Sequence, residues 1–229
     1  MSTQAVLRNT SSGHQVVRFT NDQQLLGLLT PLHSIPPNVA TVKVPRNACV
    51  YWEGDPVGQL YEVVSGAVRA CRVLADGRRQ IGAFYLPGDI FGLETEADHL
   101  FSAEAVVDTQ VLIVKSPIVP FDQWDIQDAP HIWEAMRCEL RRTRDHVLML
   151  GKTAHERVAS FLLEMAERIA SSDEVELPMP RQDIADYLGL TIETISRTLA
   201  QLESRSMIAM PTSKRIVLRK RATLRKLAE

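Results

Sequence analysis

The chain has 229 residues, of which 45% are hydrophobic and 24% are charged, a composition typical of a folded globular protein. No apolar run is long enough to span a bilayer, and the polar first residues lack the apolar stretch of a signal peptide, so we expect a cytoplasmic protein rather than a membrane or secreted one. Three widely spaced cysteines, Cys49, Cys71 and Cys138, argue against a disulfide framework and fit a reducing compartment.

Charge is unevenly distributed along the chain. The net charge is −2, yet residues 151–229 contain 13 Lys/Arg against 11 Asp/Glu, and from Lys214 onward seven basic residues accompany one acid. A basic C-terminal part suits contact with a polyanion, although a solvated basic tail would give the same count.

The N-terminal half has the pattern of a β domain. Residues 1–20 are polar, and we expect a flexible segment there. Residues 21–120 contain short alternating segments rich in Val, Ile, Tyr and Leu, separated by glycines, which predict an antiparallel β-roll. Asp76-Gly77 is a strong signal for a tight hairpin turn, because such a turn needs residues that tolerate positive φ.

Residues 121–151 predict one long helix for self-association. Apolar residues recur there at spacings of three and four and form one narrow seam with charged flanks. Such a seam is typical of helix pairing, so we expect a homodimer; packing against the chain's own β domain is the alternative. The predicted interface consists of Ile132, Met136, Leu140, Thr143, Val147 and Leu150.

Residues 152–229 have the pattern of a winged helix-turn-helix domain, so the fold class is α+β. After a hinge at Gly151-Lys152 and an amphipathic helix come the short helix PRQDIADYL, a tight turn at Leu188-Gly189-Leu190, and the helix TIETISRTLAQLE with Thr191 as its N-cap. The stretch SMIAMPTSKRIVLRK predicts the two strands of a wing, and a basic helix is expected at 222–227.

The outer face of TIETISRTLAQLE predicts base recognition. Glu193 and Arg197 lie one turn apart, where a recognition helix enters the major groove. A carboxylate accepts a hydrogen bond from cytosine, and a guanidinium spans two acceptors of guanine. The alternative is an exposed ion pair, worth only about 0.2–0.5 kcal/mol. The predicted base contacts are Ile192, Glu193, Ser196 and Arg197, and the predicted phosphate contacts are Arg181, Thr191, Thr194, Gln201, Lys214 and Arg215.

With these features, the chain resembles the Crp/Fnr superfamily of bacterial transcription regulators, most closely its FixK-like and Fnr-like branch. The stretch DIADYLGLTIETISRTLAQLE contains the branch's E-x-x-S-R recognition signature at Glu193, Ser196 and Arg197, and LYEVVSGAVRA with DGRRQIGAFYLPGDIFG matches the family's cyclic-nucleotide-binding-like β-roll. The resemblance implies a homodimer on a two-fold symmetric site with half-sites like TTGAT, and RNA polymerase as a partner.

Two departures from the family pattern concern cofactors. The cysteines lack the clustered spacing of an iron–sulfur ligand set, so we expect no cluster. Nucleotide-binding members hold the cyclic phosphate with an Arg-Ser or Arg-Thr pair, whereas here Phe101 precedes Ser102 and no arginine lies between Gly88 and Val114. A phosphate would lack its guanidinium partner, so we expect no cyclic nucleotide and no cofactor.

The leading hypothesis is a transcriptional activator that works without a small-molecule effector and controls genes of low-oxygen respiration or nitrogen fixation, as the resemblance implies. The alternative is an effector-gated regulator whose β-roll binds haem or another small molecule. None of the six histidines has metal-ligand spacing, so we expect no metal site. Common catalytic motifs are also missing from the sequence, which predicts no catalytic residues and no enzyme.

Overall fold

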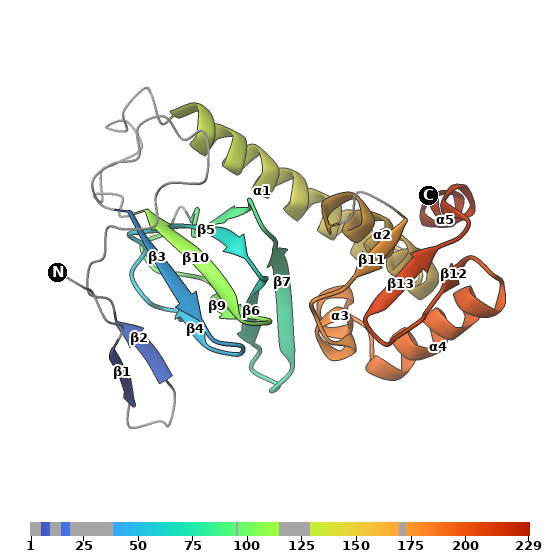
Figure 1. Ribbon diagram of the computed structural model, residues 1–229, viewed down its shortest axis with the longest axis horizontal. Helices are drawn as coiled ribbons and strands as arrows, with labels where there is room; N and C mark the ends of the chain where they lie inside the picture. The colour runs from blue at the N-terminus through green and yellow to red at the C-terminus, as the bar shows by residue number, and fades with distance from the viewer. Residues whose placement is uncertain (1–5, 10–14, 19–38, 95, 115–128, 170–172) are drawn as a thin grey trace. The chain divides into compact units, whose positions relative to one another are not determined.

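The computed structural model describes residues 6–9, 15–18, 39–94, 96–114, 129–169 and 173–229, and their contacts divide into two compact units (Figure 1). The first unit comprises residues 1–72 and 84–138, and the second comprises residues 73–83 and 139–229. Within the described residues, no helix is long and apolar enough to cross a membrane.

The strands of the N-terminal half form two sheets, which confirms the predicted β-roll. One sheet has the order β1-β2-β4-β9-β6-β7 and the other β3-β10-β5-β8. Most described pairs are antiparallel, whereas β2 meets β4 in parallel at Val16 and Cys49. The strands are β1 (Val6–Asn9), β2 (Gln15–Arg18), β3 (Val39–Val44), β4 (Cys49–Tyr51), β5 (Leu60–Ser65), β6 (Val68–Val73), β7 (Arg79–Tyr85), β8 (Ile90–Phe91), β9 (Ser102–Ala105) and β10 (Thr109–Val114).

Strands β1 and β2 lie in the segment 1–20, where the sequence suggests no regular structure. They pair as an antiparallel hairpin from Val6 opposite Arg18 to Asn9 opposite Gln15. The sequence does not predict these two strands, because strands of four residues are too short to show a clear alternating pattern.

In β4, β5 and β9 of the roll, alternate side chains enter the core, whereas β6 buries four successive residues from Val68 to Cys71. In β5, Tyr61 and Val63 are buried while Glu62 between them is only partly covered, as the two-residue period of a strand requires. Burial of apolar side chains between the sheets is the main stabilising contribution. The fully buried side chains here include Ile81, Phe84 and Phe91.

The turn at Asp76-Gly77 closes a hairpin, as the sequence predicts, but it is longer than the tight two-residue form. The backbone N–H of Leu74 donates to the Arg78 carbonyl over 2.8 Å, so five residues connect β6 to β7. Gly77 has a φ of +81°, and the Asp76 carboxylate accepts from the backbone N–H of Arg78 over 3.0 Å. This carboxylate contact stabilises the wider turn.

The second unit contains the helices and the small sheet of a winged helix-turn-helix domain, so the α+β prediction is confirmed (Figure 1). The predicted wing has two strands, whereas the observed sheet has three, in the order β11-β13-β12. The elements are α1 (Ala129–Leu150, which begins in the first unit), α2 (Ala154–Ile169), β11 (Glu174–Glu176), α3 (Arg181–Leu188), α4 (Ile192–Ser204), β12 (Ile208–Ala209), β13 (Arg215–Leu218) and α5 (Arg221–Ala228).

Candidate DNA-binding interface

The turn between α3 and α4 is built as the sequence predicts. Gly189 ends α3 in the left-handed conformation, at φ 62° and ψ 39°, which a residue without Cβ adopts at little cost. Thr191 then caps α4, since its hydroxyl oxygen accepts from the backbone N–H of Thr194 over 3.2 Å. These two residues end one helix and begin the next within a few positions.

Helix α4 has one buried face and one exposed face. Ile195, Leu199 and Leu202 are buried at helical spacing, and they fix the rotation of α4 against its neighbours. Glu193 and Arg197 are exposed on the other face, while Ile192 and Ser196 beside them are half-buried. The four predicted base contacts therefore lie in the first two turns of α4, and the acid and the guanidinium are open to solvent.

Glu193 is held in its charged form. Hydrogen bonds from its own backbone N–H and from the Thr191 side chain lower the pKa of the carboxyl, and the charge of Arg197 adds to the effect. In the described part of the chain, neither Glu193 nor Arg197 forms an ion pair. Each can therefore present its charge to a base edge.

The side chain of Arg181, the first residue of α3, lies against α4 and the wing. Its Nη1 is 3.5 Å from the Ser196 hydroxyl and its Nη2 is 3.7 Å from the sulfur of Met210. Its Nε is buried without a hydrogen-bond partner among the described residues. The side chain thus joins α3, α4 and the base of the wing at the edge of the predicted contact surface.

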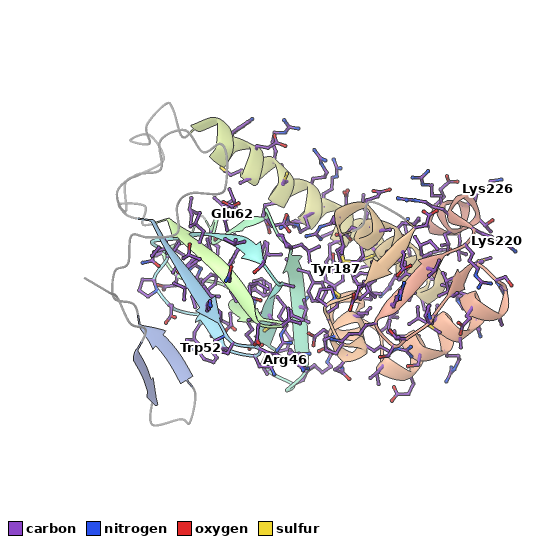
Figure 2. The ribbon with its side chains drawn as sticks, in the orientation of Figure 1. Arg46, Trp52, Glu62, Tyr187, Lys220 and Lys226 are labelled. Atoms are coloured by element: carbon purple, nitrogen blue, oxygen red, sulfur yellow. The ribbon has the colours of Figure 1, made fainter. Side chains whose placement is uncertain are left out.

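The wing carries the remaining predicted basic contacts. Lys214 is exposed at its tip, and the Thr212 hydroxyl accepts from the backbone N–H of Arg215 over 3.0 Å, which shapes the turn. The Arg215 guanidinium forms an ion pair with Glu174 of β11, so it is directed along the small sheet. Figure 2 shows Lys220 and Lys226 at the α5 end of this unit, and Arg225 also lies in the last turn of α5.

Two contacts in this region have no signal in the sequence. The Gln201 side-chain oxygen contacts the His155 ring of α2, so this predicted phosphate contact has a partner within the unit. The Glu203 carboxylate accepts from the backbone N–H of Met210 over 2.9 Å and ties the wing to the end of α4. Both pairs join separate elements, and helical periodicity says nothing about such partners.

Part of the predicted dimer seam on α1 is exposed. Leu140 is 73% exposed and Val147 is 62% exposed, while Thr143 between them is also open. Met136 and Leu150 are half-buried, and the side chain of Ile132 lies outside the described residues. Exposed apolar residues at this spacing indicate a face that another surface covers.

Comparison with known proteins agrees with this architecture. A model of the cyclic nucleotide-binding domain matches residues 41–119, and a model of the Crp-like helix-turn-helix domain matches residues 156–227. The nitrogen fixation regulation protein FixK of Azorhizobium caulinodans is 48% identical over 189 residues, which cover 80% of this chain and 76% of the relative. The FixK of Rhizobium meliloti is 41% identical over 191 residues, covering 82% and 86%.

The chain belongs to the Crp/Fnr family of transcription regulators. Among solved structures, FixK2 from Bradyrhizobium japonicum superposes with a TM-score of 0.78 at 45% identity, covering 84% of this chain and 98% of that one. The chain is therefore a DNA-binding transcription regulator and not an enzyme.

In the β-roll of this Crp/Fnr regulator, the side chains that follow Gly92 contact other residues of the roll. The Glu94 carboxylate lies 3.0 Å from the His99 ring and accepts from the backbone N–H of Leu100 over 2.7 Å. The buried His99 ring stacks on Tyr51 with ring centroids 3.6 Å apart.

Phe101 stands directly before Ser102, and the guanidinium of Arg72 lies 5.8 Å from the Phe101 ring centre. The Ser102 hydroxyl accepts from the backbone N–H of Glu53 over 2.9 Å, so the glutamate and the serine of this segment both have partners in the roll.

Two of the three cysteines of this regulator are packing residues. Cys49 and Cys71 are buried, Cys138 on α1 is half-buried, and none of the three is in a disulfide. Burial raises the pKa of the Cys49 thiol, and the charge of Glu104 acts in the same direction. Both effects favour the protonated thiol at Cys49, which is a poorer nucleophile than the thiolate. Within the described residues, no group of His, Cys, Asp and Glu side chains is arranged to hold a metal ion.

Proposed function

We propose that the protein is a sequence-specific transcriptional activator that binds DNA as a homodimer, at a two-fold symmetric site with half-sites like TTGAT. The observation that carries the proposal is the exposed Glu193–Arg197 face in the first two turns of α4, directly after the helix-turn-helix turn. An acid and a guanidinium one turn apart can select a cytosine and a guanine. Ser196 and Ile192 complete the base-reading set, with Ile192 against a thymine methyl group.

Phosphate contacts position this face on the duplex. We assign them to Arg181, Thr191, Thr194, Gln201, Lys214 and Arg215. Lys214 is well placed for such a contact, because it is exposed at the tip of the wing. Arg215 and Gln201 must exchange their present partners, Glu174 and His155, for phosphate oxygens. Such contacts fix register and orientation without carrying sequence information.

Pairing of two chains through the α1 seam places two recognition helices on the same DNA site. The seam comprises Ile132, Met136, Leu140, Thr143, Val147 and Leu150. A dimer of this kind places its recognition helices about one helical turn of DNA apart, ~34 Å. The exposure of Leu140 and Val147 supports the pairing, since these apolar side chains gain cover only from another surface.

Activity without a small-molecule effector is part of the proposal. The arrangement of Glu94 with His99 and Leu100, and the Phe101 that precedes Ser102, support a roll that takes no cyclic nucleotide. The relatives named as nitrogen fixation regulators lead us to propose target genes for nitrogen fixation or low-oxygen respiration. The cytoplasm is the proposed location, and RNA polymerase is the proposed partner at the promoter.

Selection of bound duplexes from a random pool, with purified ligand-free protein, tests these points together. The expected product is a two-fold symmetric sequence whose half-sites contain the guanine and the cytosine read by Arg197 and Glu193. Recovery of unrelated sequences would contradict base reading by α4. If duplexes are recovered only after cell extract is added, the effector-gated alternative replaces effector-free activity.

A further inference from the structure

The side chain of Arg157, near the start of α2, lies where three segments of the second unit meet. Its Nε donates to the Lys152 carbonyl over 2.8 Å, its Nη1 to the Leu188 carbonyl over 2.8 Å, and its Nη2 to the Leu150 carbonyl over 2.6 Å. All three nitrogens of one guanidinium are thus engaged by backbone oxygens. Lys152 belongs to the link between α1 and α2.

Two of the three acceptors are carbonyl groups at helix C-termini, which lack a hydrogen-bond donor within the helix. Leu150 is the last residue of α1 and Leu188 is the last residue of α3, so neither carbonyl has a partner within its own helix. Helix C-termini also carry a partial negative charge that a cation stabilises. A single guanidinium therefore caps two helices at once, and its planar fork fixes their ends relative to each other.

A second contact joins the same two helices. The His146 ring of α1 lies 4.3 Å from the Tyr187 ring of α3, centre to centre, with an angle of 39° between the ring planes. Tyr187 also contacts Phe161 of α2, at 5.9 Å between ring centres. Figure 2 labels Tyr187 in this unit. With Arg157 at the helix ends and these rings one turn away, α1 and α3 are fastened at two points.

We propose that Arg157 is a positioning residue for the recognition of paired half-sites. The proposal rests on the homodimer proposed above. The seam on α1 places the two-fold axis, and α3 packs on α4, which carries Glu193 and Arg197. The angle between α1 and α3 therefore sets the distance between the two recognition helices. The Arg157 fork holds that angle.

The test uses Arg157→Lys, which keeps the charge and most of the stem but removes the planar fork. Arg168→Lys is the matched control, because Arg168 lies on the same helix and pairs with Glu164 one turn away. Binding is measured to duplexes with one half-site, with two half-sites at the selected spacing, and with that spacing changed by two base pairs in either direction. The half-site sequence comes from the selection experiment.

For Arg157→Lys we expect unchanged binding to one half-site and a loss of about 10–100-fold on the correctly spaced pair, since an avidity gain depends on simultaneous engagement. The preference for one spacing should flatten. A second measurement follows the distance between spin labels at position 205, just after α4, in the DNA-free dimer. This distance distribution should broaden in Arg157→Lys and remain narrow in Arg168→Lys.

Three outcomes would overturn the positioning role. The first is an unchanged spacing preference and an unchanged label distance in Arg157→Lys. The second is equal weakening on one and two half-sites, and the third is loss of the dimer; in both cases Arg157 would support the fold and not the spacing. Failure of the homodimer proposal is distinct from these, because the wild-type protein itself would then gain nothing from a second half-site.

Discussion

At the scale of single residues, the proposed function depends on two exposed side chains of α4, Glu193 and Arg197. Arg197 is exposed on α4, and its buried neighbours hold the helix so that its side chain faces outward. Replacing Arg197 with Ala should cost roughly 1–3 kcal/mol of operator affinity and relax discrimination at the guanine it reads. Titration of the operator and of variants at that base pair measures both effects.

Arg205→Ala is the control for this change, because Arg205 is an exposed residue at the C-cap of the same helix, away from its N-terminal turns. It should leave base discrimination unchanged. Equal weakening of Arg197→Ala on operator and random DNA would contradict a base-reading role and leave a phosphate contact.

The buried His146 ring should make the stability of the second unit depend on pH. Burial lowers the pKa of its imidazole, and its Nδ1 is buried without a hydrogen-bond partner among the described residues. The unfolded chain binds a proton near pH 6.5 and the folded chain only at lower pH, so the unfolded state holds more protons in between. The free energy of unfolding should therefore fall as the pH drops below about 6.5.

Denaturant unfolding at several pH values between 5 and 7.5 checks this effect. The variant His146→Phe keeps a ring against Tyr187 and removes the titrating group. It should show a shallower loss of stability on the acid side than the wild-type protein. Parallel curves for the two proteins would show that His146 does not contribute to the pH dependence.

At the scale of elements, two glycines with similar φ values differ in the space around them. Alanine substitutions at these positions therefore distinguish the cost of backbone strain from the cost of steric crowding. Gly54 and Gly66 have φ values of +85° and +89°. A Cβ at Gly54 would meet nothing within 4 Å, whereas at Gly66 it would lie 2.5 Å from the Thr109 hydroxyl and 2.8 Å from the Asp108 carbonyl oxygen. The Thr109 hydroxyl is itself buried and donates to the Ala67 carbonyl over 3.0 Å, so it has little room to move.

Both Gly→Ala changes therefore impose the same left-handed strain, about 1–2 kcal/mol. Gly66→Ala should cost about 1–3 kcal/mol more, because it also crowds a closed turn. Thermal and denaturant unfolding of the two variants give the comparison. Equal losses would mean that the β5–β6 turn relaxes freely around an added methyl group.

The elements also show where sequence reasoning succeeds and where it fails. The end of α1 at Leu150 and the turn around Gly189 and Thr191 follow from local signals, namely an apolar period, a glycine and a capping hydroxyl. Residues 121–128 of the predicted helix 121–151 lie outside the described residues. The strand β11 was missed because three residues cannot display a period. Its Glu174 pairs with Arg215, and Gln201 meets His155, so side chains predicted to contact phosphate have partners from remote segments. Such partners depend on the tertiary fold.

At the scale of the whole molecule, the proposed specificity depends on two copies of a small base-reading surface. One α4 presents few side chains to the bases, and each correct base contact contributes only about 1–3 kcal/mol of discrimination. Two such helices at a fixed spacing multiply the selectivity. In this proposal the dimer is as important for sequence recognition as the residues on α4, and variants in the α1 seam test it.

Leu140 and Leu148 offer a matched pair for that test, since both are exposed leucines of α1, at 73% and 63%, yet they point in different directions. Leu140 lies on the predicted seam, and Leu148 lies well to its side, because each residue turns the helix by about 100°. Leu140→Asp should split the dimer and abolish tight operator binding, since it places a charge where two apolar faces meet. Leu148→Asp should change neither property. Sedimentation and operator titration read the result, and a dimer that survives Leu140→Asp but not Leu148→Asp would move the interface to another face of α1.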